Sequence, residues 1–155
     1  MSGPEKKLQG NQPKIKILDF DSLVEIVKKM SFDEGQYMLW EEVYKLPRWY
    51  FTAKPVEDIS QLKPFICEVD GKGWFCASTD AKHAIKFAER QKFNYPGGKT
   101  LVICMKPLEA AEWMSTYSKE VYGVRFNEGE HGWYAPIANL LPMYQYLKGL
   151  NKIYC

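Results

Sequence analysis

The 155-residue sequence has no apolar run longer than about six residues, whereas a bilayer-spanning helix needs roughly 20. Residues 1–7 carry charge without an apolar stretch behind them, unlike a secretory signal peptide. The net charge is also small: 21 basic and 19 acidic residues give a formal charge of +2, too little for a global field that attracts nucleic acid or an anionic membrane. The sequence therefore predicts a cytoplasmic protein that does not bind membranes and for which nucleic acid is an unfavoured partner.

The spacing of the cysteines and histidines lacks the patterns typical of metal sites. No CxxC pair occurs among the four cysteines, which are Cys67, Cys76, Cys104 and Cys155. In a reducing compartment, cysteines inside apolar runs act as small buried hydrophobic residues. Potential zinc ligands two to four residues apart occur only at Glu128, Glu130 and His131, in an acidic and glycine-containing segment that is more typical of a plain hairpin turn than of a zinc site. We therefore expect no disulfide framework, no metal and no cofactor.

Catalytic patterns are sparse as well. Only His83 and His131 could activate a cysteine nucleophile, and the nearest pairing places Cys76 in a strand and His83 on a lysine-bearing helix face. Residues 97–100, Gly-Gly-Lys-Thr, resemble the end of a phosphate-binding loop, but Phe93 replaces the required first glycine and a strand follows instead of a helix. No catalytic residue is predicted, which argues against an enzyme without excluding one.

Composition and periodicity predict an ordinary globular domain. Hydrophobic residues make up 46% of the chain and charged residues 26%. Residues 1–12 have too little apolar surface to offset their ordering entropy, so we expect a disordered tail followed by one domain over 13–155. Helices are expected at 20–30, 31–46, 80–91, 107–121 and 140–147, and strands at 14–18, 48–53, 64–69, 74–78, 101–105, 123–127 and 133–137. This order predicts an α+β fold, with a mixed, mostly antiparallel sheet of about five strands and helices packed on it.

Three local signals are particularly specific. Ser31 and Glu34 have the spacing of a capping box, which predicts a helix start. The glycines within residues 70–73 favour a tight turn between two strands. Residues 101–105 are apolar at successive positions, so we expect them, including Val102, in an interior strand.

The aromatic content is the feature that most suggests a binding surface, since 15% of the residues are Phe, Trp or Tyr. Consecutive strand residues point to opposite sheet faces, so residues 49–51 and the pair Trp133 and Tyr134 each place an aromatic ring on both faces. At least one ring of each group could then meet solvent or a groove, although helices on both faces would bury them all. The residues predicted to bind are Trp49, Tyr50, Glu130, His131, Trp133 and Tyr134.

Two segments in the middle and second half of the chain resemble the SseB-like family. Residues 74–80, Trp-Phe-Cys-Ala-Ser-Thr-Asp, read as a strand leading into a helix, and residues 123–129, Gly-Val-Arg-Phe-Asn-Glu-Gly, read as a strand leading into a turn. That family consists of small bacterial α/β domains associated with type III secretion gene clusters or serine sensitivity. The resemblance covers about half of the chain, and it departs where the family tends to have Asn-Pro, because Glu128 follows Asn127 here. It implies a non-catalytic accessory module without a cofactor and assigns no residue a role.

Two functional hypotheses follow from these observations. The first is a non-enzymatic interaction domain that binds a protein partner through the aromatic surface. The alternative is a small-molecule-binding domain or enzyme whose pocket is lined by the same aromatic residues, with Cys76, Glu130 and His131 as its polar members.

Overall fold

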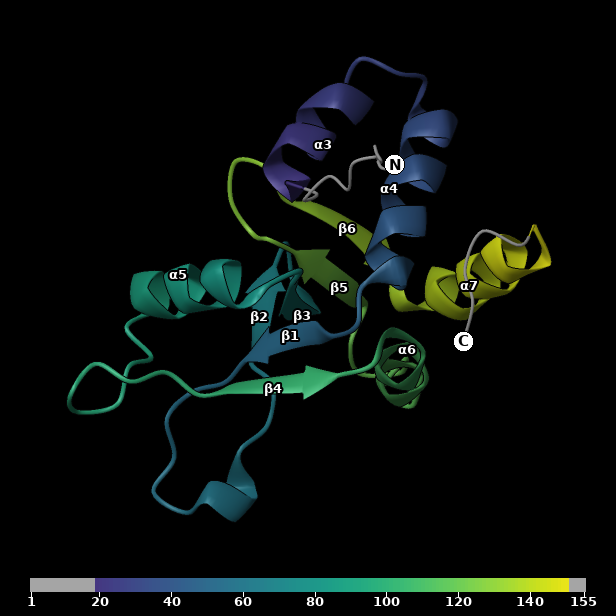
Figure 1. The fold of residues 1–155 in the computed structure, drawn as a ribbon. Coiled ribbons are helices and arrows are strands. Elements are labelled where there is room, and N and C mark those ends of the chain that lie inside the picture. The colour runs from purple at the N-terminus through teal and green to yellow at the C-terminus, as the bar shows by residue number, and fades with distance from the viewer. Residues whose placement is uncertain (1–18, 151–155) are drawn as a thin grey trace, which may run out of the picture.

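A computed structural model of the chain describes residues 19–150 (Figure 1). The expected tail at 1–12 and the expected strand at 14–18 lie outside the described residues. The helices of the described part are α3 (Phe20–Val27), α4 (Phe32–Lys45), α5 (Ala81–Gln91), α6 (Pro107–Ser115) and α7 (Leu140–Gly149), with short 3-10 turns η1 (Ile59–Gln61) and η2 (Ile137–Asn139). The strands are β1 (Trp49–Thr52), β2 (Ile66–Val69), β3 (Lys72–Ser78), β4 (Val102–Met105), β5 (Gly123–Phe126) and β6 (Trp133–Pro136).

The six strands form one mixed sheet in the order β4-β1-β3-β5-β6, with β2 also paired to β3. All pairs are antiparallel except β3 with β5. On one edge, the long strand β3 pairs with β2 near its start and with β1 at its end. The α+β class and the mostly antiparallel mixed sheet are thus confirmed, with six strands where about five were expected.

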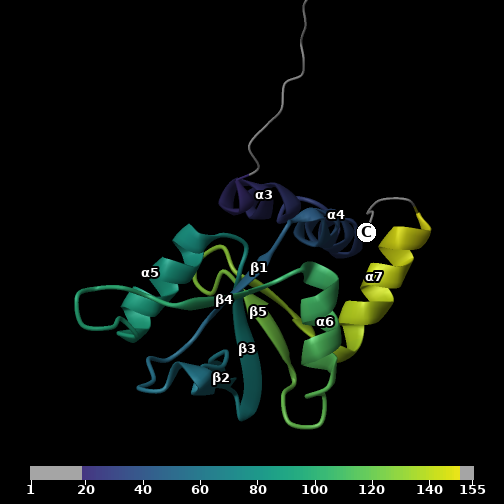
Figure 2. The same ribbon diagram turned by 60° about the horizontal axis from the view of Figure 1, so that its bottom comes forward.

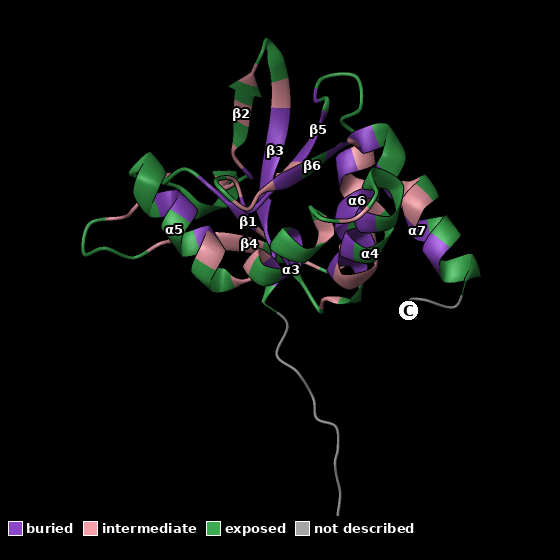
Figure 3. Cartoon of the chain, turned by 90° about the horizontal axis from the view of Figure 1, so that it is seen from above, coloured by how far each residue is buried: buried purple, intermediate pink, exposed green. Residues whose placement is uncertain are grey.

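Helices cover both faces of this sheet. Figure 2 shows α5 on one side of the strands and α6 and α7 on the other. The main core lies on the side of α4, α6 and α7, where fully buried side chains from these helices meet β1, β3 and β5; examples are Leu39, Met114, Phe51, Phe75 and Val124. Figure 3 shows that β2 and the adjoining end of β3 are exposed and extend away from the helices.

Local sequence explains how α3 and α4 form a tight helical hairpin. The Ser31 hydroxyl accepts a hydrogen bond from the Glu34 amide at 3.4 Å and donates one to the Glu34 carboxylate at 3.0 Å, so the predicted helix cap is present. Where the two helices cross, a Cβ atom on Gly35 would lie 2.9 Å from the Val27 carbonyl oxygen. Only glycine allows this close approach without displacing the backbone.

The hairpin of β2 and β3 is tighter than expected. Val69 pairs with Lys72, leaving Asp70 and Gly71 as the two turn residues. Both have positive φ, 54° and 77°, as a two-residue hairpin turn with the correct twist requires.

Two sequence predictions need correction. The strand at 101–105 is not interior, because β4 ends the sheet order and Cys104 is exposed. Both faces of β4 are partly covered, so apolar residues occur on both faces. Cover of the faces does not require a neighbouring strand on each edge. The helix from Pro107 ends at Ser115 rather than near 121.

No helix within residues 19–150 is both long enough and apolar enough to cross a membrane.

Candidate functional site

The two predicted binding residues of β1 lie within the sheet. Trp49 is completely buried, and its indole N–H donates a hydrogen bond to the Val43 carbonyl oxygen at 2.9 Å. Its ring packs edge to face on Phe126. Tyr50 is half-buried on the opposite face. Trp49 therefore acts as a core residue and offers no surface to a partner.

Trp133 and Tyr134 point to opposite faces of β6, as strand alternation predicts. Trp133 is buried and stacked between Phe20, at a centroid distance of 5.8 Å, and Phe126, at 5.5 Å. Tyr134 is 57% exposed and packs edge to face on Trp74 at 5.4 Å. The Arg125 guanidinium lies over both of these rings, 5.1 Å from Trp74 and 5.4 Å from Tyr134.

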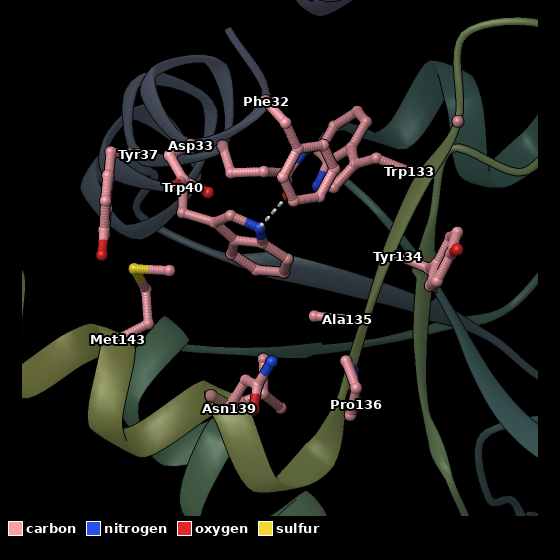
Figure 4. Close-up of a pocket in the computed structure, with 13 residues that line it drawn as sticks. Phe32, Asp33, Tyr37, Trp40, Trp133, Tyr134, Ala135, Pro136, Asn139 and Met143 are labelled. Carbon is pink, nitrogen blue, oxygen red and sulfur yellow. Dashed lines mark hydrogen bonds between the residues drawn. The ribbon is translucent and has the colours of Figure 1, made fainter.

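A hollow of about 400 Å³ opens between α4 and the β6–α7 segment (Figure 4). We call it the central hollow. Its lining is mostly aromatic and apolar, with a few polar side chains at hydrogen-bonding positions: Phe32, Asp33, Gln36, Tyr37, Trp40, Gly132, Trp133, Tyr134, Ala135, Pro136, Asn139, Leu140 and Met143. The predicted residues Trp133 and Tyr134 are thus brought to one site, whereas Trp49, Tyr50, Glu130 and His131 are not part of its lining.

Two indole groups define the interior of the central hollow. Figure 4 shows the hydrogen bond by which Trp40 Nε1 donates to Gln36 Oε1 at 3.2 Å. Trp133 Nε1 is buried and has no hydrogen-bond partner among the described residues. A buried donor without an acceptor carries a desolvation cost of roughly 1–3 kcal/mol, which a ligand oxygen could recover.

Two smaller hollows continue the central one at its ends. One, of about 380 Å³, shares Phe32, Gln36 and Trp133 with it and extends between α3 and α4. The other, of about 230 Å³, shares Tyr37 and Met143 and extends over α7. We call the three together the aromatic groove; it is elongated and open, with Phe32 77% exposed at the α4 end.

Sequence reasoning missed the α4 wall of this groove. Leu39 and Val43 are among the residues of α4 that face the core. Phe32 and Tyr37 lie on the same helix, but their aromatic rings are exposed. Exposed aromatic residues away from the buried side of a helix were the available signal. Their partners in β6 lie about 100 residues further along the chain, so the pairing itself had no sequence signature.

His131 has a structural partner that a plain turn residue would lack. Its Nε2 lies 2.9 Å from a Glu25 carboxylate oxygen, and its Nδ1 lies 3.9 Å from Asp21, both on α3. Glu130, the other predicted polar residue of this turn, is exposed. The turn between β5 and β6 is therefore attached to α3 through His131.

His83 contacts the same Asp21 carboxylate and extends this network toward α5. Its Nδ1 lies 2.8 Å from Asp80, and its Nε2 lies 3.1 Å from the same Asp21 oxygen that faces His131. Burial alone would raise the pKa of Asp80, but hydrogen bonds from the His83 amide and ring and from the Thr79 hydroxyl outweigh it and lower the pKa. Each ring nitrogen of His83 is within hydrogen-bonding distance of a carboxylate, so the ring connects α3 to α5. Neither nitrogen is left to exchange a proton with a substrate.

The cysteine–histidine pairing considered from sequence does not form. Cys76 Sγ lies 3.0 Å from Cys67 Sγ, while the His83 ring bonds to Asp80 and Asp21. Among the described residues, no group of three or more His, Cys, Asp or Glu side chains is arranged to hold a metal ion.

Comparison with known proteins adds no assignment. No protein-family model matches the sequence, and no curated protein matches it. The SseB-like resemblance stays a prediction.

Proposed function

We propose that the chain is a protein-interaction module that binds an extended, apolar segment of a partner protein along the outer edge of β6. The observation that carries this proposal is the lining of the central hollow by five consecutive residues, 132–136. Side chains at successive strand positions point to opposite faces. A hollow that contacts all five must therefore face the strand edge, where the backbone is accessible.

An edge strand offers backbone N–H and C=O groups to an added strand. β6 is the last strand in the described sheet order, with β5 as its only partner strand there. In strand addition, main-chain hydrogen bonds supply affinity and pockets for alternate side chains supply specificity. Here the Trp40 and Met143 side chains form an apolar pocket beside the edge, and the amide side chains of Gln36 and Asn139 also line the hollow.

The length of the aromatic groove favours a partner segment over a compact ligand. The central hollow continues at both ends, between α3 and α4 and over α7, so an occupant several residues long could make contacts throughout. The small-molecule alternative is favoured by one observation, the unpartnered Trp133 N–H in a hollow of about 400 Å³. Peptides and compact apolar compounds are therefore both tested as ligands.

The test begins with a displayed library of random eight-residue peptides, from which binders of the full chain are selected and their affinities measured. Phe32→Ala removes an exposed ring from the groove and should weaken binding by about 10-fold or more, as for an interface anchor. Ile59→Ala is the matched control, because Ile59 is 61% exposed on η1 and lines no part of the groove. Bound peptide should also slow amide hydrogen exchange within residues 132–136.

The possible results separate the hypotheses. Equal effects of Phe32→Ala and Ile59→Ala would place binding elsewhere and overturn the proposal. Unchanged exchange in β6 with a bound peptide would rule out strand addition. Failure to select any peptide, combined with binding of compact apolar compounds that perturb the Trp133 and Met143 resonances, would support the small-molecule alternative instead.

A further inference from the structure

Cys67 and Cys76 form a close pair of thiols on the face of the sheet that carries Tyr134. Their Sγ atoms are 3.0 Å apart. Cys67 pairs directly with Trp74 in the β2–β3 ladder, so Cys76, two residues further along β3, is its diagonal neighbour on the same face. Both cysteines are free thiols in this structure.

The position of β2 allows this pair to close. A disulfide needs a sulfur–sulfur distance of about 2.05 Å, and diagonal positions start with Cα atoms roughly 7–8 Å apart, slightly beyond the usual disulfide range. One strand must therefore move by about 1 Å toward the other. In the described sheet β2 pairs only with β3, and Figure 3 shows it extending away from the helices, so β2 can make this movement without disturbing the core.

The surroundings give the two sulfurs different roles. The hydrogen bond between the two thiols lowers the pKa of Cys67, and the positive charge of Arg125 acts in the same direction against burial and the Glu128 carboxylate. The same hydrogen bond, together with burial, raises the pKa of Cys76. Cys67 is also the more accessible of the two. Cys67 is thus the attacking thiol and Cys76 the resolving thiol.

We propose that Cys67 and Cys76 form a reversible redox site that reacts with a low-molecular-weight disulfide to give an intramolecular Cys67–Cys76 disulfide. This inference does not depend on what binds in the aromatic groove.

The reaction balances as two thiol–disulfide exchanges. Cys67 releases its proton to solvent, and its sulfur attacks one sulfur of the small disulfide, whose S–S bond breaks; the departing thiolate takes a proton from solvent. Cys76 then releases its proton and attacks the Cys67 sulfur, and the second small thiolate leaves and is protonated. The protein loses two protons and two electrons in total, and the small disulfide takes them up to become two thiols.

The test treats the reduced full-length protein with oxidised glutathione, blocks the remaining thiols with iodoacetamide, and maps the modified peptides by mass spectrometry. The expected product is a Cys67–Cys76 disulfide that dithiothreitol reverses. It should form at least about 10-fold faster than the mixed disulfide at Cys104, the exposed unpaired control on β4. In Cys76→Ala, Cys67 should retain glutathione as a stable mixed disulfide, whereas in Cys67→Ser, Cys76 should stay reduced.

Wild-type mapping alone is decisive if a variant fails to fold. A stable glutathione adduct on Cys67 with Cys76 still reduced would overturn the proposal, because it would mean that the resolving step does not occur. Faster modification of Cys104 than of Cys67 would also overturn it.

Discussion

Asn127 connects the end of β5 to the junction between β3 and α5. Its side-chain oxygen accepts a hydrogen bond from the buried Thr79 amide at 3.0 Å, and its amide nitrogen donates to the Thr79 hydroxyl at 3.1 Å. Its φ of 48° lies in the left-handed region, which asparagine adopts more readily than most residues. One side chain thus satisfies a buried backbone donor and shapes the start of the turn that carries His131.

Replacing Asn127 by alanine should therefore destabilise the protein by about 2–3 kcal/mol, because the Thr79 amide loses its acceptor and the left-handed backbone loses a favourable residue. Urea unfolding of the two proteins measures the difference. Asn94→Ala is the control, since the half-buried Asn94 amide donates to the Thr100 hydroxyl and not to a buried backbone group, and its cost should be below about 1 kcal/mol. Equal costs would mean that the Asn127–Thr79 contact contributes no special stability.

At the scale of elements, the start of α5 makes stability sensitive to acid. Asp80 caps this helix by accepting from the His83 amide at 2.8 Å, and its pKa is lowered from the ordinary 3.8. A depressed carboxyl pKa in the folded state stabilises the protein at pH above the unfolded value, and this contribution is lost as the pH falls below about 3.8 through the folded pKa. Asp80→Asn keeps a capping oxygen but does not titrate. Its urea midpoint should fall less steeply than that of the wild type between about pH 4 and pH 2, and parallel curves would contradict this assignment.

Edge and interior strands of the sheet should differ in how well they tolerate a buried charge. Val102 is half-buried on the edge strand β4, while Val124 is completely buried on the interior strand β5. Val124→Asp should prevent soluble expression, because its charge would be buried without a partner. Val102→Asp should give a folded protein that is less stable by about 1–2 kcal/mol. If both variants fail to fold, the edge position of β4 is wrong.

Features formed by residues close together in the sequence were predictable, whereas features formed by residues far apart in the sequence were not. The Ser31 cap and the Asp70–Gly71 turn depend on residues a few positions apart, so local patterns identified them. The edge position of β4 was missed because apolar periodicity reports burial of the faces and contains no information on neighbouring strands. The contacts of His131 with Asp21 and Glu25 on α3 join residues more than a hundred positions apart, beyond the reach of any motif.

For the whole molecule, the candidate groove was predictable only in part for the same reason. Strand alternation correctly indicated that Trp133 and Tyr134 point to opposite faces. Which of them is exposed depends on where α3 and α4 pack, because Phe20 of α3 covers Trp133. Phe32 enters the site only through the tertiary packing of α4 against the β6–α7 segment.

The same tertiary packing predicts that the described part of the chain unfolds as one unit. Tyr44 on α4 is buried, and its hydroxyl donates to the Leu140 carbonyl oxygen at the start of α7, at 2.7 Å and 96 positions away. Its ring also packs on Trp49 of β1 and Tyr144 of α7. Helices α4 and α7, far apart in the sequence, therefore share one cluster with the sheet, so unfolding of either helix exposes the buried surface of the other.

We expect urea unfolding followed by tryptophan fluorescence and by far-ultraviolet circular dichroism to give superimposable single transitions, as for a two-state domain. Tyr44→Phe removes one buried hydrogen bond while keeping the ring, so both curves should shift together by about 1–2 kcal/mol with unchanged slope, because the surface exposed on unfolding is the same. Tyr37→Phe is the matched control, since Tyr37 is exposed and its change should leave both curves in place. A fluorescence transition that precedes the dichroism transition, in wild type or in Tyr44→Phe, would show that the α4–α7 packing separates from the sheet before the rest of the fold is lost.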